Sequence, residues 1–210
     1  ADEARGILYV MGGMNCKSDC NKQDISYFDT VEAFSLASNA WQVLPPMPTP
    51  RRDFGSAVDA EGRLWTVGGC GGANVANGAC PPLTVVEIYD PTTRQWQAPP
   101  HVQLPEPRHG MLVGTDGDEI FLVGGSADEG VFNAPPPSKA AWRLGITGEL
   151  SQASWRQMPN LGTPRYGLNK GYSFVAGGKL FAIGGSIGST GGFLSYEPTP
   201  SMEWLDVGAL

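Results

Sequence analysis

The chain has 210 residues, 41% of them hydrophobic, and 21 acidic side chains against 14 basic ones give it a net charge of -7. This length suits one domain or one part of a larger repeat domain. The acidic balance, with no basic cluster beyond Arg51-Arg52, argues against nucleic acid or an anionic membrane surface as a partner. No run approaches the roughly 18 apolar residues of a membrane helix, so we expect no membrane insertion.

The first unit, residues 1–49, begins at an apolar strand, "ILYVMGG", that ends in a glycine pair. A long polar loop follows, then a strand "VEAF" and a strand around Trp41. Short runs rich in β-branched and aromatic residues, bounded by Gly, Pro and Asp, predict strands. We therefore expect three strands here, one fewer than in the next unit.

The second unit, residues 50–105, shows four predicted strands. After the turn "TPRRDFG" come "GSAVDA" and, beyond the hairpin signal "EG", "RLWTVGG". A loop with two cysteines leads to "TVVEIYD", whose Asp-Pro turn precedes "RQWQAP". Glu87 on the third strand, like Glu32 in the first unit, is expected to be a structural carboxylate that accepts hydrogen bonds from backbone or arginine.

The third unit, 106–161, and the fourth, 162–210, repeat this order with "EPRHG" and "EIFLVGG", then "TPRYG" and "KLFAIGG". Their later strands are "AAWRLG" with a following Trp155, and "FLSYEPTPSMEW". No stretch has the 3.6-residue period of a helix. The sequence therefore predicts an all-β protein.

Three markers recur in register along the chain. Glycine pairs stand at Gly12-Gly13, Gly68-Gly69, Gly124-Gly125 and Gly184-Gly185, and their first members are 56, 56 and 60 residues apart. Pro-Arg turns place Arg51, Arg108 and Arg165 at even intervals of 57 residues, and tryptophans lie late in the units at Trp41, Trp96, Trp155 and Trp204. A repeat of this length is typical of β-propeller blades. We expect the glycines to relieve crowding against the next blade and the tryptophans to fill the gaps between diverging blades.

The glycine pairs, "VEIYDPTTRQW" and the Pro-Arg-x-Gly turns resemble kelch repeats over nearly the whole chain. The resemblance implies four-stranded antiparallel blades in a single propeller segment covering 1–210. It is weaker in unit three, where Trp142 stands where a tyrosine is usual. It is also weaker in unit four, which lacks the Val-Glu pair but keeps Tyr196 and Trp204. Kelch propellers usually have six or seven blades, so about four units predict an open arc, part of a larger propeller, or an arc that a partner completes.

The four cysteines fall in two close pairs within loops, Cys16 with Cys20 and Cys70 with Cys80. This favours two local disulfides and an oxidising compartment, either extracellular or the lumen of an organelle. Four free thiols in the cytoplasm and a bond between the two loops remain alternatives. A four-thiolate metal site is a further one, although the spacing is not that of a zinc ribbon.

The glycines of "RLWTVGGCGG" do not predict a phosphate-binding loop, because Pro81-Pro82 and another strand follow where a helix would be needed. Some proteins with kelch propellers are enzymes, including copper radical oxidases and a sialic acid mutarotase. The two histidines, His101 and His109, lie in one turn region without a Tyr-His pair, which argues against a copper centre built from these residues. We expect neither cofactor nor metal. The alternative to a binding module is the propeller of a secreted carbohydrate-active or oxidase-like enzyme whose catalytic residues lie mostly elsewhere.

The long, dissimilar loops after the glycine pairs are the predicted protein-binding surface, because recognition concentrates in variable loops on a repeated scaffold. The candidate contacts in these loops are Tyr27, Phe28, Asn74, Asn77, Asp128, Glu129 and Phe132. Arg51, Arg108 and Arg165 are candidates for a cationic ring at the channel end; the alternative is that they pair with structural acids such as Glu32 and Glu87. The function predicted is a non-enzymatic interaction or scaffold module, either alone or as a subunit of a larger assembly.

Overall fold

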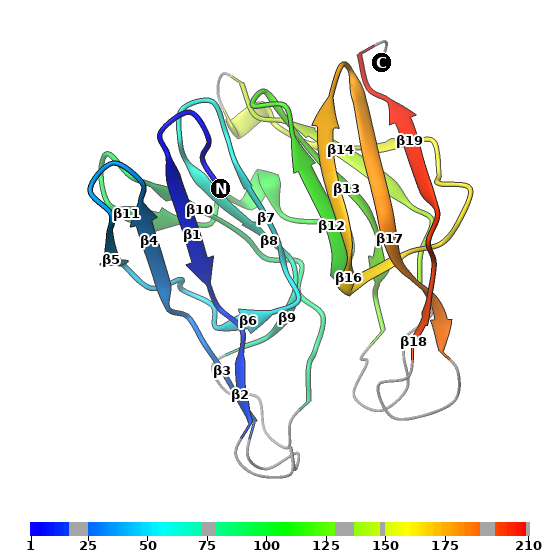
Figure 1. The fold of residues 1–210 in the computed structure, drawn as a ribbon, viewed down its shortest axis with the longest axis horizontal. Coiled ribbons are helices and arrows are strands. Elements are labelled where there is room, and N and C mark those ends of the chain that lie inside the picture. Colours follow the sequence, from blue (N-terminus) through cyan, green and yellow to red (C-terminus); the bar gives the residue numbers. More distant parts are fainter. Residues whose placement is uncertain (17–24, 73–78, 129–136, 148–149, 190–195, 209–210) are drawn as a thin grey trace.

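The computed structural model describes residues 1–16, 25–72, 79–128, 137–147, 150–189 and 196–208. Its antiparallel sheets follow one another in chain order, from blue to red in Figure 1, in a propeller arrangement. The all-β prediction is confirmed: apart from short 3-10 turns at η2 (Pro100–Val102) and η3 (Leu150–Gln152), the described elements are strands. None of the described segments forms a helix with the length and apolar character needed to cross a membrane.

Each sheet is one blade. Blade 1 contains β1 (Ile7–Met11), β4 (Val31–Ser35) and β5 (Ala40–Leu44), and blade 2 contains β7 (Gly55–Val58), β8 (Leu64–Val67), β10 (Val86–Asp90) and β11 (Gln95–Gln97). Blade 3 contains β12 (His109–Thr115), β13 (Glu119–Ser126), β14 (Ala141–Gly145) and β15 (Trp155–Met158). Blade 4 contains β16 (Tyr166–Ala176), β17 (Lys179–Ser189), β18 (Tyr196–Pro198) and β19 (Met202–Asp206). Two small two-stranded ribbons extend beyond the glycine-pair ends of blades 1 and 2: β2 (Met14–Cys16) with β3 (Ile25–Tyr27), and β6 (Arg51–Arg52) with β9 (Cys70–Gly71).

The core lies between the blades because alternate residues of each strand point to opposite neighbours. Trp65 and Val67 of β8 face blade 3, whereas Leu64 of the same strand packs with Val31 and Tyr89 between blades 1 and 2. Trp65 is fully buried. The blades therefore depend on their neighbours for burial, as expected of a repeat whose sheets have two apolar faces.

The glycine pairs do have the predicted role at the blade contacts. All eight glycines have positive φ angles, and a Cβ on Gly68 would lie 2.5 Å from the carbonyl oxygen of Arg108 in the next blade. In the first three pairs the second glycine donates to the arginine carbonyl oxygen of the next blade, as Gly69 N does to Arg108 O at 2.9 Å. Trp96 and Trp155 pack against the core clusters, and their indole N–H groups donate to Pro45 O and Val102 O on the segment before their own blade.

Blade 4 corrects the marker Trp204. β19 pairs directly with β17, with Glu203 opposite Ala182, so this strand takes the third position of the blade and not the fourth. Glu203 thus occupies the register of Glu87, which lies opposite Thr66 in blade 2. Trp204 therefore belongs to the third strand and is not equivalent to Trp96. The counterpart in unit four of the Val-Glu pair is Met202-Glu203.

Blade 3 corrects the position given to Trp142. Trp142 lies opposite Leu122, two residues before the glycine pair, which is the register of Glu87 in blade 2. Leu144, opposite Ile120, takes the position of the tyrosine. Trp142 therefore replaces the structural glutamate, and its buried indole N–H has no hydrogen-bond partner within the described ranges.

Candidate functional site

The three marker arginines are bound inside the blades. Arg51 and Arg165 are fully buried and Arg108 is 4% exposed. Burial lowers the pKa of Arg51, and the charge of Glu87 opposes that effect. This is the structural role that we weighed against a cationic ring, and it leaves none of these guanidinium groups at the surface for a partner.

Arg51 defines the binding pattern. Its Nη1 donates to Gly68 O at 2.8 Å and to Val85 O at 2.9 Å, and its Nη2 lies 2.7 Å from Glu87 Oε2. Thr49 Oγ1 donates to the other carboxylate oxygen of Glu87 at 2.7 Å. The side chain thereby ties the segment before β7, the inner strand of blade 2, to the ends of β8 and β10.

Arg165 repeats the pattern in blade 4. Its Nη1 donates to Gly184 O at 2.5 Å and to Ser201 O at 3.0 Å, and its Nη2 donates to Glu203 Oε1 at 2.8 Å. Burial alone would raise the pKa of Glu203, but hydrogen bonds from Thr163, Arg165 and Gly162 hold it below its usual value.

In blade 3, where Trp142 replaces the glutamate, Arg108 keeps its bond to Gly124 O at 2.7 Å and takes its carboxylate from Glu106 instead.

The propeller end that carries the glycine-pair loops holds a second set of contacts, around Arg52. The disulfide Cys70–Cys80 is present, which confirms that predicted pair; Cys20, and with it the Cys16–Cys20 pair, lies outside the described residues. Arg52 Nε lies 3.1 Å from Cys80 Sγ, and its guanidinium stands 6.0 Å from the centre of the Tyr27 ring. The Tyr27 hydroxyl donates to Ala79 O at 2.7 Å. Loops of blades 1 and 2 are thus joined around one arginine.

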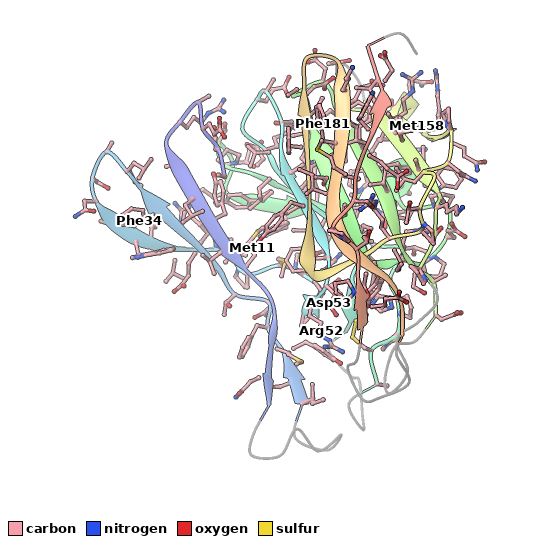
Figure 2. All side chains as sticks on the ribbon, turned by 45° about the vertical axis from the view of Figure 1, so that its right-hand side comes forward. Met11, Phe34, Arg52, Asp53, Met158 and Phe181 are labelled. Carbon is pink, nitrogen blue, oxygen red and sulfur yellow. A yellow bond between two sulfur atoms is a disulfide. The ribbon has the colours of Figure 1, made fainter. Side chains whose placement is uncertain are left out.

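Arg52 and Asp53 lie side by side at this end of the molecule, as Figure 2 shows. Their side chains are 19% and 17% exposed, with Arg52 Nε 3.5 Å from Asp53 Oδ2. Burial raises the pKa of Asp53, and Arg52 partly opposes this. Both residues border a cleft of about 450 Å³ beside Met14. Asp53 Oδ2 also approaches the two cysteine sulfurs, but a disulfide offers no thiolate to a metal.

His109 and Tyr166 form a buried pair that separate sequence positions did not reveal. The Tyr166 hydroxyl lies 2.8 Å from His109 Nδ1, and His109 Nε2 lies 2.8 Å from Asp128 O. Because a carbonyl only accepts, Nε2 carries the proton and Nδ1 accepts from the tyrosine. Burial lowers the pKa of His109, in keeping with this neutral form. Both ring nitrogens are engaged, so the pair fastens the loop at Asp128 and offers no lone pair to a metal.

The loop candidates have different placements. Tyr27 is a tether between loops, Phe28 is 39% exposed beside it, and Asp128 is exposed at the start of its loop. Asn74, Asn77, Glu129 and Phe132 lie outside the described residues. The sequence reasoning missed Arg52 and Asp53. A signal was present, because Arg52, His109 and Tyr166 each directly follow a marker arginine.

The comparisons agree with this geometry. The family model for the Kelch motif matches residues 4–48 and 50–101, which are blades 1 and 2. Kelch domain-containing protein 8B of Bos taurus is 30% identical over 157 residues, 73% of this chain and 41% of that protein. Kelch-like ECH-associated protein 1A of Danio rerio is 33% identical over 124 residues, 57% of this chain and 18% of that protein.

The solved structure of YjhT has the same fold, with a TM-score of 0.66 and 19% identity over 89% of this chain and 57% of that one. The chain thus spans less than half the length of each of the two curated relatives. The chain belongs to the kelch-repeat family of β-propeller proteins.

Proposed function

We propose that the chain is a protein-interaction module that binds its partner at the propeller end around Arg52. The observation that carries this proposal is that the Cys70–Cys80 disulfide closes the base of the blade 2 loop, and the Tyr27–Ala79 hydrogen bond attaches that base to the blade 1 loop. Loops held in place before binding lose less conformational entropy when a partner docks. The name of Kelch-like ECH-associated protein 1A records an association for that relative, which is consistent with this role.

The chemistry of the surface suggests how a partner docks. Phe28 and Met14 are 39% and 41% exposed and supply apolar contact area. Arg52 and Asp53, within the cleft, supply a donor and an acceptor of opposite charge. Apolar anchors around a partly desolvated polar pair are typical of the residues that carry most of the binding energy at protein interfaces. The disulfide further favours work in an extracellular or lumenal compartment.

Chemical cross-linking in extracts of the native source, read by quantitative mass spectrometry, tests the proposal. Phe28→Asp should abolish capture of the specific partner. Leu36→Asp should leave it unchanged, because Leu36 is a 71%-exposed apolar residue at the opposite end of blade 1. Equal capture by the two variants would refute a binding surface at Phe28. Counting free thiols in the unreduced protein tests the compartment, and reactive thiols at Cys70 and Cys80 would contradict it.

A further inference from the structure

Asp53 has a backbone conformation that the next blade gives to a glycine. Asp53 and Gly110 each follow a marker arginine by two residues, and their φ angles are +56° and +61°. The sheet registers agree, because in both blades the residue two further on lies opposite the valine that precedes the glycine pair. Glycine adopts this left-handed conformation freely, whereas a residue with a Cβ is strained in it. The aspartate is therefore a source of strain that a glycine would avoid.

The carboxylate of Asp53 accepts no good hydrogen bond from the described part of the chain. Arg52 Nε lies 3.5 Å from Oδ2, longer than the roughly 2.7–3.2 Å of an N–H···O bond. Cys70 Sγ lies 3.9 Å from the same oxygen, but a disulfide sulfur has no hydrogen to donate. By contrast, Asp59 at the other end of β7 accepts hydrogen bonds of 2.8, 2.6 and 2.8 Å. Packing within the chain thus does not explain why an aspartate stands at residue 53.

The burial of Asp53 makes this shortage of donors costly. Its side chain is only 17% exposed, and burial raises its pKa, an effect that Arg52 partly opposes. A carboxylate that has lost water without gaining hydrogen-bond donors is in an unfavourable environment. A cationic donor from outside the chain would satisfy it.

A cavity for such a donor lies beside Asp53. It has a volume of about 330 Å³ and is bordered by the inner strands β7, β12 and β16 of blades 2, 3 and 4. Asp53 is the only charged residue among the described residues that line it. The lining also offers the hydroxyl groups of Ser56 and Ser173 and the apolar side chains of Phe54 and Met111. The cavity therefore combines one negative charge with neutral polar groups and apolar walls.

We propose that Asp53 is the anchor for a cationic side chain, a lysine or an arginine, of the partner polypeptide. The inference rests on the proposed function, because it names the chemistry by which a partner is recognised at the propeller end around Arg52. The ammonium or guanidinium group donates charge-assisted hydrogen bonds to the Asp53 carboxylate, while its methylene stem lies against Phe54 and Met111. The net charge of -7 attracts a basic partner to this acidic chain.

A small cationic probe tests the anchor without the partner. The probe is a capped pentapeptide with one arginine between two pairs of glycines, titrated into the isotope-labelled chain and followed by NMR chemical shifts. Its counterpart with citrulline in place of arginine has nearly the same shape and no charge. The arginine peptide should bind at least about tenfold more tightly, because only its guanidinium makes charge-assisted hydrogen bonds.

Variants of the chain separate a binding role from a structural one. Asp53→Asn keeps the shape and tolerates the left-handed conformation, and it should weaken the arginine peptide at least about tenfold. Asp29→Asn, at a half-buried acid on the same end of blade 1, should change the affinity less than about twofold. Asp53→Gly should also lose the peptide, yet its Tm should be unchanged or higher by up to about 4 °C, since glycine relieves the strain.

Four results would overturn the inference. They are no saturable binding of the arginine peptide up to roughly 10 mM, equal affinity for the two peptides, unchanged affinity in Asp53→Asn, and a lowered Tm in Asp53→Gly. Failure of the proposed function gives a different result, because it appears as equal partner capture by Phe28→Asp and Leu36→Asp. The affinity of Asp53→Asn for the arginine peptide is measured without the partner and decides the anchor alone.

Discussion

Removal of the Glu87 carboxylate should destabilise the protein far more than removal of the equivalent group in blade 1. Glu87→Ala leaves the fully buried guanidinium of Arg51 with three carbonyl acceptors, Thr49 O, Gly68 O and Val85 O, and no counter-charge. Breaking a buried ion pair on one side costs about 3–5 kcal/mol of unfolding free energy. Thr49 also loses its acceptor, since its hydroxyl donates to the same carboxylate.

Glu32→Ala is the matched control, because it removes the same side chain from the same register of an exposed blade face. Its cost should stay within about 0.5 kcal/mol. Urea denaturation followed by tryptophan fluorescence gives both values, provided that the m-values agree. If the two variants differed by less than about 1 kcal/mol, the argument that burial makes the Arg51–Glu87 pair critical would be refuted.

Three further predictions concern other parts of the scaffold. Replacing both Cys70 and Cys80 by serine should cost about 2–3 kcal/mol, seen as a lower Tm that reductant no longer changes; an unaltered Tm would contradict it. Gly68→Ala, at φ +56° with a backbone oxygen 2.5 Å from the new Cβ, should lose more than about 1 kcal/mol, whereas Gly145→Ala, with nothing within 4 Å, should lose little. The lowered pKa of Glu203 adds stability at pH values above the ordinary glutamate pKa and is lost as pH falls through the folded value; Glu203→Gln should therefore flatten the acid limb of the Tm–pH curve.

The sequence predicted the repeat because its markers answer local requirements. At Gly68 the φ angle is positive and a neighbouring backbone lies close, so any residue with a Cβ would be strained there. The glycine pairs can therefore be recognised as a repeat in a single sequence. A tryptophan has no such local requirement. Trp204 therefore looked like Trp96, although only the pairing of β19 with β17 decides its place.

A better signal was the spacing from arginine to glutamate. Glu87 lies 36 residues after Arg51, and Glu203 lies 38 residues after Arg165, which identifies the third strand of blade 4. The site at the loop end was harder to predict. Arg52 contacts Tyr27 and Cys80, which come from two different loops. No spacing in the sequence predicts that these three side chains lie together.

In blade 3 the arginine's hydrogen bond to the glycine carbonyl is kept, whereas the acid that pairs with it comes from a different position. With Trp142 in the glutamate register, Arg108 still donates to the glycine carbonyl but obtains its carboxylate from Glu106, two residues away along the chain. The constant element is thus the bond to the backbone of the glycine-pair strand, and the acid is interchangeable as long as it neutralises the charge. Since buried ion pairs add little net stability over apolar packing, the pattern is better explained by alignment of the inner strand with its neighbour.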